Sequence, residues 1–310
     1  MLQPYASSAE KLARFGLVSA SILILLFLIV PILVIIPLSF NSSSFLTYPM
    51  DGFSLRWYEE LMSSQEWQQA FKNSFIIAPG ATLLAMIFGT MASVGLCRGD
   101  FRFKGVVMAF LISPMIVPLI IVAVGLYFFF AKLQLLNSYL GLVVAHAMLG
   151  VPFVVITVNA TLQGFNTNLS RAAASLGAPP LTVFFRVVLP LIAPGVISGG
   201  LFAFATSFDE VVVTLFLASP SQRTLPLQMF AGIRENISPN IAAVATIMVV
   251  LSVLMLLTLE VLRRRNEKLK VKKNKPTGTV PFGLIENHVR PFRVRPGTAN
   301  YCPDSEVENG

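Results

Sequence analysis

Residues Gln163 to Pro194 read QGFNTNLSRAAASLGAPPLTVFFRVVLPLIAP and form the longest polar interval between hydrophobic stretches of the chain. Within this interval, four apolar residues recur at the spacing i, i+3, i+4 and i+7, which predicts a short helix with one small apolar face. They are Leu169, Ala172, Ala173 and Leu176. We expect Asn168 or Ser170 to cap the start of this helix and Gly177 to end it.

A second helical segment is predicted from Leu181 to Leu189. Its large apolar side chains are Phe184, Phe185 and Val188. We expect it to stop at Pro190, because proline has no backbone N–H and its ring clashes with the preceding turn of a helix. A polar interval that folds into two short helices indicates a segment built to contact another molecule.

The composition excludes an ordinary soluble domain. Of the 310 residues, 55% are hydrophobic and 12% charged, and the mean hydropathy is +0.74. A membrane-spanning helix needs roughly 20 apolar residues. Six stretches reach this length: Phe15–Phe40, Trp67–Leu96, Gly105–Ala131, Tyr139–Leu162, Leu191–Val213 and Ile241–Leu262. The sequence therefore predicts an all-α polytopic membrane protein with six transmembrane helices.

The distribution of Lys and Arg predicts how the chain is oriented. Basic residues gather before residue 15, around Arg102, in the central loop and after Leu262, whereas the first outer loop is acidic. Both termini and the central loop are thus expected to be cytoplasmic. The predicted organisation is a cytoplasmic arm (1–14), a transmembrane domain (15–262) that includes the loop 163–190, and a basic, disordered tail (263–310).

The net charge of +8 follows from the same bias of basic residues to one side, so it does not indicate nucleic-acid binding. The basic run after Leu262 can contact anionic lipid headgroups. Retention of positive charge on the cytoplasmic side explains the run equally well. Membrane lipids are therefore the expected contacts of this end of the chain.

Two adjacent carboxylates, Asp209 and Glu210, lie in the fifth predicted span. A carboxylate at the centre of a bilayer costs roughly 2.5 to 3.5 kcal/mol, which a cation or a water-filled cavity normally offsets. The spans hold no Lys or Arg placed to neutralise both acids. Two interpretations follow: a solvated pair at the outer rim, or a site for a positively charged substrate with Ser207 as a further oxygen donor and Phe208 beside it.

Two further residues have one structural and one functional interpretation. Trp57, in the first outer loop, is either an interfacial anchor or an aromatic wall for a cationic ligand. His146, in the fourth span, is a candidate for function because it is ionisable. We expect it instead to hydrogen-bond a neighbouring helix, because no second His or acid flanks it for a proton relay.

The spacing in the central loop resembles the signature of permease subunits of type I ABC importers, E-A-A-x3-G-x9-I-x-L-P. The positions that match are Ala172, Ala173, Gly177, Leu189 and Pro190, with Arg171 in place of Glu and Val187 in place of Ile. The resemblance implies that these residues form a coupling helix that docks on a cytoplasmic ATPase dimer. It also implies a transport subunit that is no enzyme and holds no metal or cofactor, since the partner binds the ATP. The sequence contains no G-x-x-x-x-G-K-[ST] pattern of its own.

Five shorter stretches are similar to the spermidine/putrescine branch of these permeases. They begin at Ser54 (SLRWY), Ser207 (SFDEVVVT), Thr224 (TLPL), Ile237 (ISP) and Ala242 (AAVAT). This similarity implies a polyamine or similar organic cation as substrate, an extracytoplasmic solute-binding protein, a second permease subunit and a place in the bacterial inner membrane. Two alternatives remain: a permease for another cationic or amphoteric solute, such as an opine or amino-acid derivative, and an ion-coupled secondary carrier whose acids bind H+ or Na+.

Overall fold

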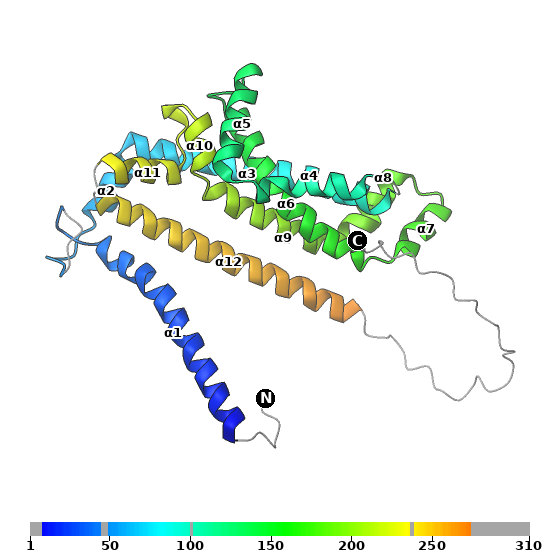
Figure 1. Cartoon of the computed structure of the whole chain (residues 1–310), viewed down its shortest axis with the longest axis horizontal. Coiled ribbons are helices and arrows are strands. Elements are labelled where there is room, and N and C mark those ends of the chain that lie inside the picture. The colour runs from blue at the N-terminus through cyan, green and yellow to red at the C-terminus, as the bar shows by residue number, and fades with distance from the viewer. Residues whose placement is uncertain (1–7, 45–48, 100–101, 236–238, 274–310) are drawn as a thin grey trace, which may run out of the picture. The chain divides into compact units, whose positions relative to one another are not determined.

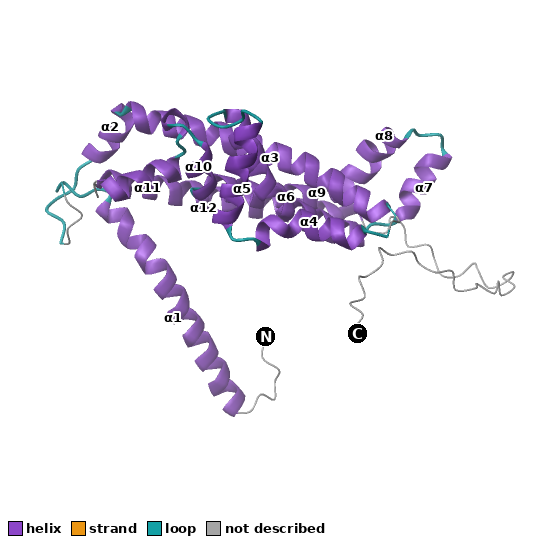
Figure 2. Cartoon of the chain, turned by 45° about the horizontal axis from the view of Figure 1, so that its top comes forward, coloured by secondary structure: helices purple, strands orange, loops and turns teal. Residues whose placement is uncertain are grey.

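The computed structural model describes residues 8–44, 49–99, 102–235 and 239–273 (Figure 1). In these residues, helices are joined by loops, as Figure 2 shows, and no β-strand is present. The predicted all-α class is therefore confirmed. The chain divides into two compact units. The first is formed by the chain up to Phe71 together with Leu225–Val253, and the second by Lys72–Thr224 together with the chain from Leu254.

In the first unit, amide side chains join helices that are far apart in the sequence. Its elements are α1 (Ser8–Leu38), α2 (Arg56–Ser63), the start of α3 (Gln65–Arg98), α11 (Leu225–Glu235) and the start of α12 (Pro239–Lys273). The Asn240 amide of α12 donates to the Glu60 carboxylate of α2 at 3.0 Å. Gln228 of α11 likewise donates to Glu66 of α3 at 3.1 Å. These bonds attach α11 and α12 to the helices that follow the first loop.

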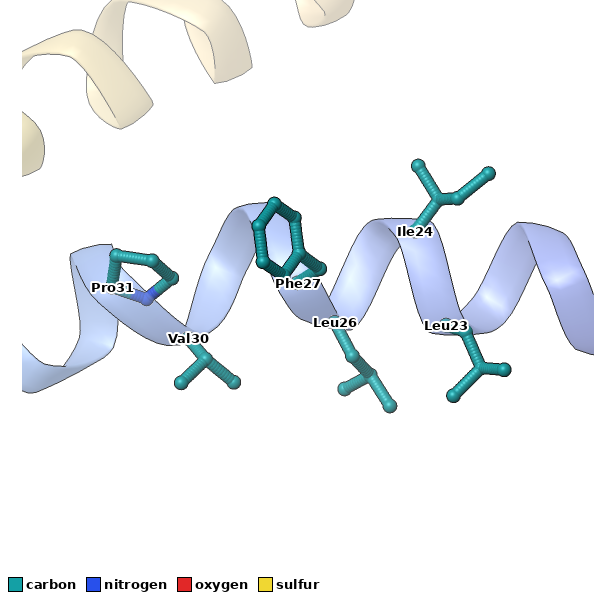
Figure 3. A pocket seen from close by; sticks show the side chains of 6 residues that line it. All are labelled: Leu23, Ile24, Leu26, Phe27, Val30 and Pro31. Atoms are coloured by element: carbon teal, nitrogen blue, oxygen red, sulfur yellow. The ribbon is translucent and has the colours of Figure 1, made fainter.

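Helix α1 is apolar on every side. Its stretch Leu12–Leu38 has a mean hydropathy of 3.2, and none of the most apolar part is buried. A surface depression on α1 is lined by Leu23, Ile24, Leu26, Phe27, Val30 and Pro31. Figure 3 shows these side chains projecting from different sides of this one helix, so the depression has no opposite wall. A helix of this kind suits contact with lipid or with another membrane-embedded helix.

Both long terminal helices extend past the predicted domain boundaries. Helix α1 begins at Ser8, inside the predicted arm 1–14, and α12 continues to Lys273, inside the tail predicted to be disordered from residue 263. Lys, Arg and Glu are good helix formers, and elongating an existing helix is much easier than starting one. Residues 1–7 and 274–310, which hold the rest of the predicted arm and tail, lie outside the described residues.

The second unit is organised around two adjacent helices, α6 and α9, which lie side by side in Figures 1 and 2. The elements of this unit are most of α3, α4 (Lys104–Ile116), α5 (Leu119–Lys132), α6 (Tyr139–Gln163), α7 (Thr167–Ser175), α8 (Pro180–Val183), a π-helical turn (Phe184–Val188), α9 (Leu189–Phe208) and α10 (Val212–Leu217). Glycines allow the close approach of α6 and α9. A Cβ at Gly150 would lie 2.8 Å from the Cβ of Ala203, and one at Gly199 would lie 2.6 Å from the Cα of Val154. Small residues are the usual means of such close packing in membranes.

Two apolar cores lie at opposite ends of α6. Around its first half, Leu142, Ala145 and Leu149 pack with residues of α5 and α10. Around its second half, Val154, Val158 and Leu162 pack with the π-helical turn and the start of α9. The residues that join the second core from this side are Val183 of α8, Val188 of the π-helical turn, and Ile192 and Val196 of α9. Helix α6 therefore contributes residues to both apolar cores.

The third predicted span, Gly105–Ala131, is not one helix, and this prediction is corrected. Helices α4 and α5 meet at an angle of 106°. The break falls at Val117, whose backbone is extended (φ −71°, ψ 136°), and at Pro118. A proline disfavours the helical conformation in the residue before it and cannot donate a helical hydrogen bond. The pair is thus a broken span or a re-entrant loop, with α4 against α6 and α5 against α10.

The other predicted spans correspond to helices with shifted ends. In the described part of the chain, four helical stretches are long and apolar enough to cross a membrane: Leu12–Leu38, Gln65–Arg98, Tyr139–Gln163 and Pro180–Phe208. The bent pair makes a fifth if it counts as one span, and α12 covers the sixth predicted span. The predicted span Leu191–Val213 is corrected, because its helix ends at Phe208 and starts much earlier, at Pro180.

Candidate functional site

The helix predicted first in the central loop is α7, and its end is set by Gly177. Gly177 has φ +81°, a left-handed conformation that only glycine adopts without strain. Its N–H donates to the Ala174 carbonyl (2.9 Å), and the N–H of Ala178 donates to the Ala173 carbonyl (3.2 Å). This pair of bonds is the Schellman ending of a helix. The predicted stop at Gly177 is confirmed.

The start of α7 differs from the prediction. The cap is Asn166, whose side-chain oxygen accepts from the Asn168 N–H at 3.0 Å, and not Asn168 or Ser170. The helix therefore begins at Thr167, because the first residue able to offer a side-chain oxygen to the free N–H groups takes the capping position.

The second predicted helical segment does not stop at Pro190, and this prediction is wrong. Helix α8, the π-helical turn and α9 form one continuous helix, Pro180–Phe208. The Leu189 N–H donates to the carbonyl of Phe184, five residues earlier. A proline leaves the carbonyl four residues before it, that of Arg186, without a donor and pushes its ring against it. The wider turn immediately before Pro190 relieves this clash, so the helix continues.

The residues of the loop signature fall into two groups by exposure. Arg171, Ala172, Gly177 and Pro190 are exposed, whereas Ala173, Val187 and Leu189 are half-buried against the second core of α6. The most exposed large apolar side chains of this region are outside the signature. They are Leu176 (88% exposed), Leu181 (72%) and Phe185 (60%). Figure 1 shows α7 and α8 together at one end of the α6–α9 pair.

The predicted apolar face of α7 is therefore mostly turned outward. Leu169 and Leu176 are exposed and only Ala173 packs against the chain's own core. We name the exposed residues Leu169, Leu176, Leu181 and Phe185 the coupling-segment patch. An apolar patch on a polar loop is a feature of surfaces that bind another protein.

The adjacent carboxylates lie in a helix break at the other end of α9, not inside a span as predicted. Helix α9 ends at Phe208, Asp209 is its C-cap residue, and α10 starts at Val212. Asp209 is exposed, whereas Glu210 is buried (6% exposed). The two neighbouring acids thus have different surroundings.

Glu210 stabilises the start of α10. Its Oε1 accepts from the Val213 N–H at 2.8 Å, and its backbone carbonyl lies 3.3 Å from the Thr214 hydroxyl, which donates to it. A carboxylate beside the N-terminus of a helix satisfies a free N–H and interacts favourably with the helix dipole. Glu210 therefore has an evident structural function.

Asp209 has no such structural explanation. It lies at the C-terminus of α9, where the helix dipole places partial negative charge and disfavours an acid. Phe208 beside it is buried, and its ring stacks on Phe204 (5.5 Å between centroids) and meets Phe75 edge-on at 6.1 Å. Asp209 is thus an exposed carboxylate next to an aromatic cluster, in a negative local field that attracts cations.

His146 of α6 contacts both helices that flank the break. Its Nδ1 lies 2.8 Å from the Ser207 hydroxyl, and its Nε2 lies 3.0 Å from the Thr214 hydroxyl. The predicted hydrogen bond of His146 to a neighbouring helix is therefore confirmed. Ser207 is 3% exposed, so in this arrangement its hydroxyl serves His146 and is not presented as an oxygen donor to a ligand.

Trp57 belongs to the first unit and holds the first loop together. It is 4% exposed, its indole N–H donates to the Asn41 carbonyl at 2.7 Å, and the Arg56 guanidinium lies 5.0 Å from the ring centroid. Next to it, the Tyr58 hydroxyl is 2.7 Å from that of Ser39. These contacts give Trp57 a role inside the first loop, which differs from both the interfacial anchor and the aromatic wall predicted for it, and they leave little of its ring for a ligand.

Residues 81–269 match the family described as "Binding-protein-dependent transport system inner membrane component". The chain belongs to this family. The permease is accordingly a transport subunit of an ABC importer in the inner membrane, and not itself an enzyme.

Two curated relatives align with most of the permease. The "Spermidine/putrescine transport system permease protein PotC" of Escherichia coli (strain K12) is 34% identical over 258 residues, which are 83% of this chain and 96% of that protein. The "Putrescine transport system permease protein PotI" of the same strain is 35% identical over 228 residues, 71% of this chain and 81% of that protein.

Among solved structures, that of a bacterial alginate ABC transporter in complex with alginate pentasaccharide-bound periplasmic protein is similar in fold. The TM-score is 0.63 at 16% identity, over 83% of this chain and 95% of that chain. At this identity the likeness concerns the fold alone. The type I importer permease fold predicted from the loop signature is thus confirmed.

Sequence reasoning missed Thr214 as a partner of His146 and the outward direction of the leucines in the coupling-segment patch. A lone His in an apolar span signals that polar partners exist, but the spacing of 68 residues between His146 and Thr214 gives no clue to their identity. The exposed Leu176 and Leu181 were visible as apolar residues in a polar loop. Their outward direction depends on where the loop turns.

Proposed function

We propose that this permease moves a polyamine or a similar organic cation into the cytoplasm, with Asp209 as the carboxylate that attracts it. The observation that carries this proposal is the exposure of Asp209 at the C-terminus of α9, beside the aromatic cluster of Phe208. Two relatives that align over most of the chain are named as spermidine/putrescine and putrescine permeases. An ammonium group would interact with both the carboxylate and the ring faces.

The proposal assigns direct contact with the substrate to fewer of the predicted site residues. Asp209 is the direct contact, Phe208 shapes its surroundings, and Glu210 and Ser207 hold the helix break in place. Trp57 remains a proposed contact only if the first loop rearranges, because its N–H and ring are occupied within that loop.

The proposed assembly contains an ATPase dimer, a second permease subunit and an extracytoplasmic solute-binding protein. The family description refers to binding-protein-dependent transport, and the similar alginate transporter was solved with its periplasmic protein. The coupling-segment patch supports docking of Gln163–Pro190 on the ATPase, since four exposed apolar side chains gather there. ATP binding would close the ATPase dimer and move this segment, which is continuous with α9.

The proposed topology places both termini and the loop 163–190 in the cytoplasm, as the distribution of Lys and Arg predicts. In this orientation, the helix Pro180–Phe208 runs from the ATPase side to Asp209 on the outer side of the membrane. Residues 263–310 are proposed to lie on the cytoplasmic face, where their basic side chains can contact lipid headgroups.

The test is uptake of radiolabelled putrescine and spermidine by cells that lack their own polyamine importers and express the complete transporter. The transporter comprises the permease with its ATPase, second permease and binding protein. We compare the wild type with Asp209→Asn, which removes the charge and keeps the size. Asp51→Asn is the matched control, because Asp51 is also exposed but lies in the first loop. ATP-dependent uptake that weakens only in Asp209→Asn supports both the substrate and the site.

Other results separate the parts of the proposal. If ATP-driven polyamine uptake is unchanged by Asp209→Asn, the importer stands and the cation site is elsewhere. If polyamines are not taken up while an opine or an amino-acid derivative is, the substrate proposal is wrong and the alternative solute class is correct. Uptake that depends on an ion gradient and not on ATP would contradict the whole proposal.

A further inference from the structure

The polar contacts around His146 are arranged across the helix break. Ser207 is in the last turn of α9, Thr214 is in the first turn of α10, and the imidazole of α6 bonds both. All three side chains are buried, with exposed fractions of 1% for His146, 3% for Ser207 and 0% for Thr214. None of them can contact a substrate directly in this arrangement.

The hydrogen bonds around His146 fit either neutral tautomer of its imidazole. With the proton on Nε2, the ring donates to the Thr214 hydroxyl (3.0 Å) and Nδ1 accepts from the Ser207 hydroxyl (2.8 Å). With the proton on Nδ1, the ring donates to the Ser207 backbone carbonyl (3.2 Å) or hydroxyl, and Nε2 accepts from the Thr214 hydroxyl. In both tautomers the imidazole bonds the last turn of α9 and the first turn of α10.

We propose that His146 is a positioning residue, whose imidazole joins the ends of α9 and α10 and thereby sets the direction of the Asp209 carboxylate. Asp209 and Glu210 lie directly between the two bonded hydroxyls, in the segment that belongs to neither helix. The angle at this break decides where Asp209 points. The inference rests on the proposed function, since it assigns His146 a role only if Asp209 contacts the substrate.

Individual hydroxyl groups can be removed from this network without leaving a large cavity. Thr214→Val replaces the hydroxyl by a methyl group of similar size, and Ser207→Ala removes only the hydroxyl. Thr214→Ser retains the hydroxyl and serves as the rescue variant. Thr82→Val is the matched control, because the Thr82 hydroxyl donates only to the carbonyl of Ala78 in its own helix.

The measurement is KM and maximal rate of putrescine and spermidine uptake by the complete transporter, at equal amounts of assembled complex in the membrane. Hydrogen bonds between helices in membranes make a modest contribution each, so we expect Thr214→Val and Ser207→Ala each to raise KM about threefold to tenfold. Maximal rate should change little, and Thr214→Ser should restore KM. Thr82→Val should leave both values unchanged.

The same variants are then measured with Asp209→Asn. If His146 acts through the carboxylate, removing the hydroxyl of Thr214 raises KM in the wild type but not in Asp209→Asn, because the group being positioned is gone. Equal effects in the two backgrounds, or a fall in maximal rate without a change in KM, would overturn the inference while the cation site stands. An unchanged KM in Asp209→Asn alone overturns the proposed site, and the inference with it.

Discussion

The two ends of the continuous helix Pro180–Phe208 differ. At its start lies a segment with exposed apolar side chains, whereas at its end lies a cluster of buried polar side chains. At the first end, α7 is closed by a local signal, the left-handed Gly177, and its leucines point outward. At the second end, the break at Asp209 is held by side chains from α6 and α10. The first end thus presents apolar side chains outward, where we propose that a partner binds, and the second end is fixed by the chain's own packing.

This difference separates two kinds of sensitivity to substitution. If the proposed docking is correct, a change at the coupling-segment patch removes a contact that forms only in the assembled transporter, and it leaves the permease itself intact. A change in the polar cluster alters the permease before any partner or substrate binds. Measuring stability, ATPase activity and uptake on the same variants therefore tests whether the two ends of the helix have the roles assigned to them.

The largest effect is expected for Gly177→Val. A β-branched residue at φ +81° is strained by roughly 1–2 kcal/mol or more, and relief of this strain would change how α7 ends. We expect membrane insertion to persist while uptake falls more than about tenfold and ATP hydrolysis no longer responds to the loaded binding protein. Gly105→Val is the control, since a Cβ there also meets nothing within 4 Å but its φ is not positive. Normal uptake by Gly177→Val would contradict the coupling role.

The next largest effect is expected for Asp209→Asn. Loss of a charge-assisted contact with an ammonium group is worth roughly 1.5 kcal/mol, which corresponds to about a tenfold rise in KM for polyamine uptake. ATP hydrolysis stimulated by the binding protein should persist, because the coupling-segment patch is at the opposite end of the helix. A fall in stimulated ATPase activity equal to the fall in uptake would show that Asp209 supports the structure of the permease and not substrate contact.

A smaller effect is expected for Leu176→Ser, at the most exposed leucine of the coupling-segment patch (88% exposed). Partial burial of a leucine side chain in a partner groove is worth about 1 kcal/mol, so the affinity for the ATPase should fall about fivefold, with no loss of thermal stability of the permease alone. The comparison is Leu133→Ser, because Leu133 is also exposed (52%) but follows α5. Equal loss of ATPase binding in both variants would argue against a specific docking surface.

The smallest effect is expected at Glu210, where the variant Glu210→Gln is compared with Glu210→Ala. The Gln side chain keeps an oxygen that can accept from Val213, so thermal stability and KM should stay near the wild type. Glu210→Ala removes this acceptor and should lower stability by about 1 kcal/mol, as for other helix caps. A KM that rises in Glu210→Gln as much as in Asp209→Asn would show that both carboxylates contact the cation.

Much of the coupling end was predictable, because backbone rules that act over a few residues govern it. The stop of α7 at Gly177 followed from the glycine and the prolines behind it. The failed prediction at Pro190 depended on the π-helical turn, which is favourable here because Val183 and Val188 are buried against α6. Burial by a helix distant in sequence offsets the local penalty of the proline.

The sequence by itself determined that this is an all-helical membrane protein, which stretches are apolar enough to enter a membrane, that a loop signature relates it to ABC importer permeases, and that two acids interrupt an apolar run. These features depend on composition and on local spacing, which do not require knowledge of neighbours. Only the tertiary structure decided that Glu210 is buried and bonds the start of α10, that Asp209 is exposed, and that His146 joins the two sides of their break. Adjacent residues on a chain can face different surroundings, and which surroundings they face depends on the packing of segments far apart in sequence.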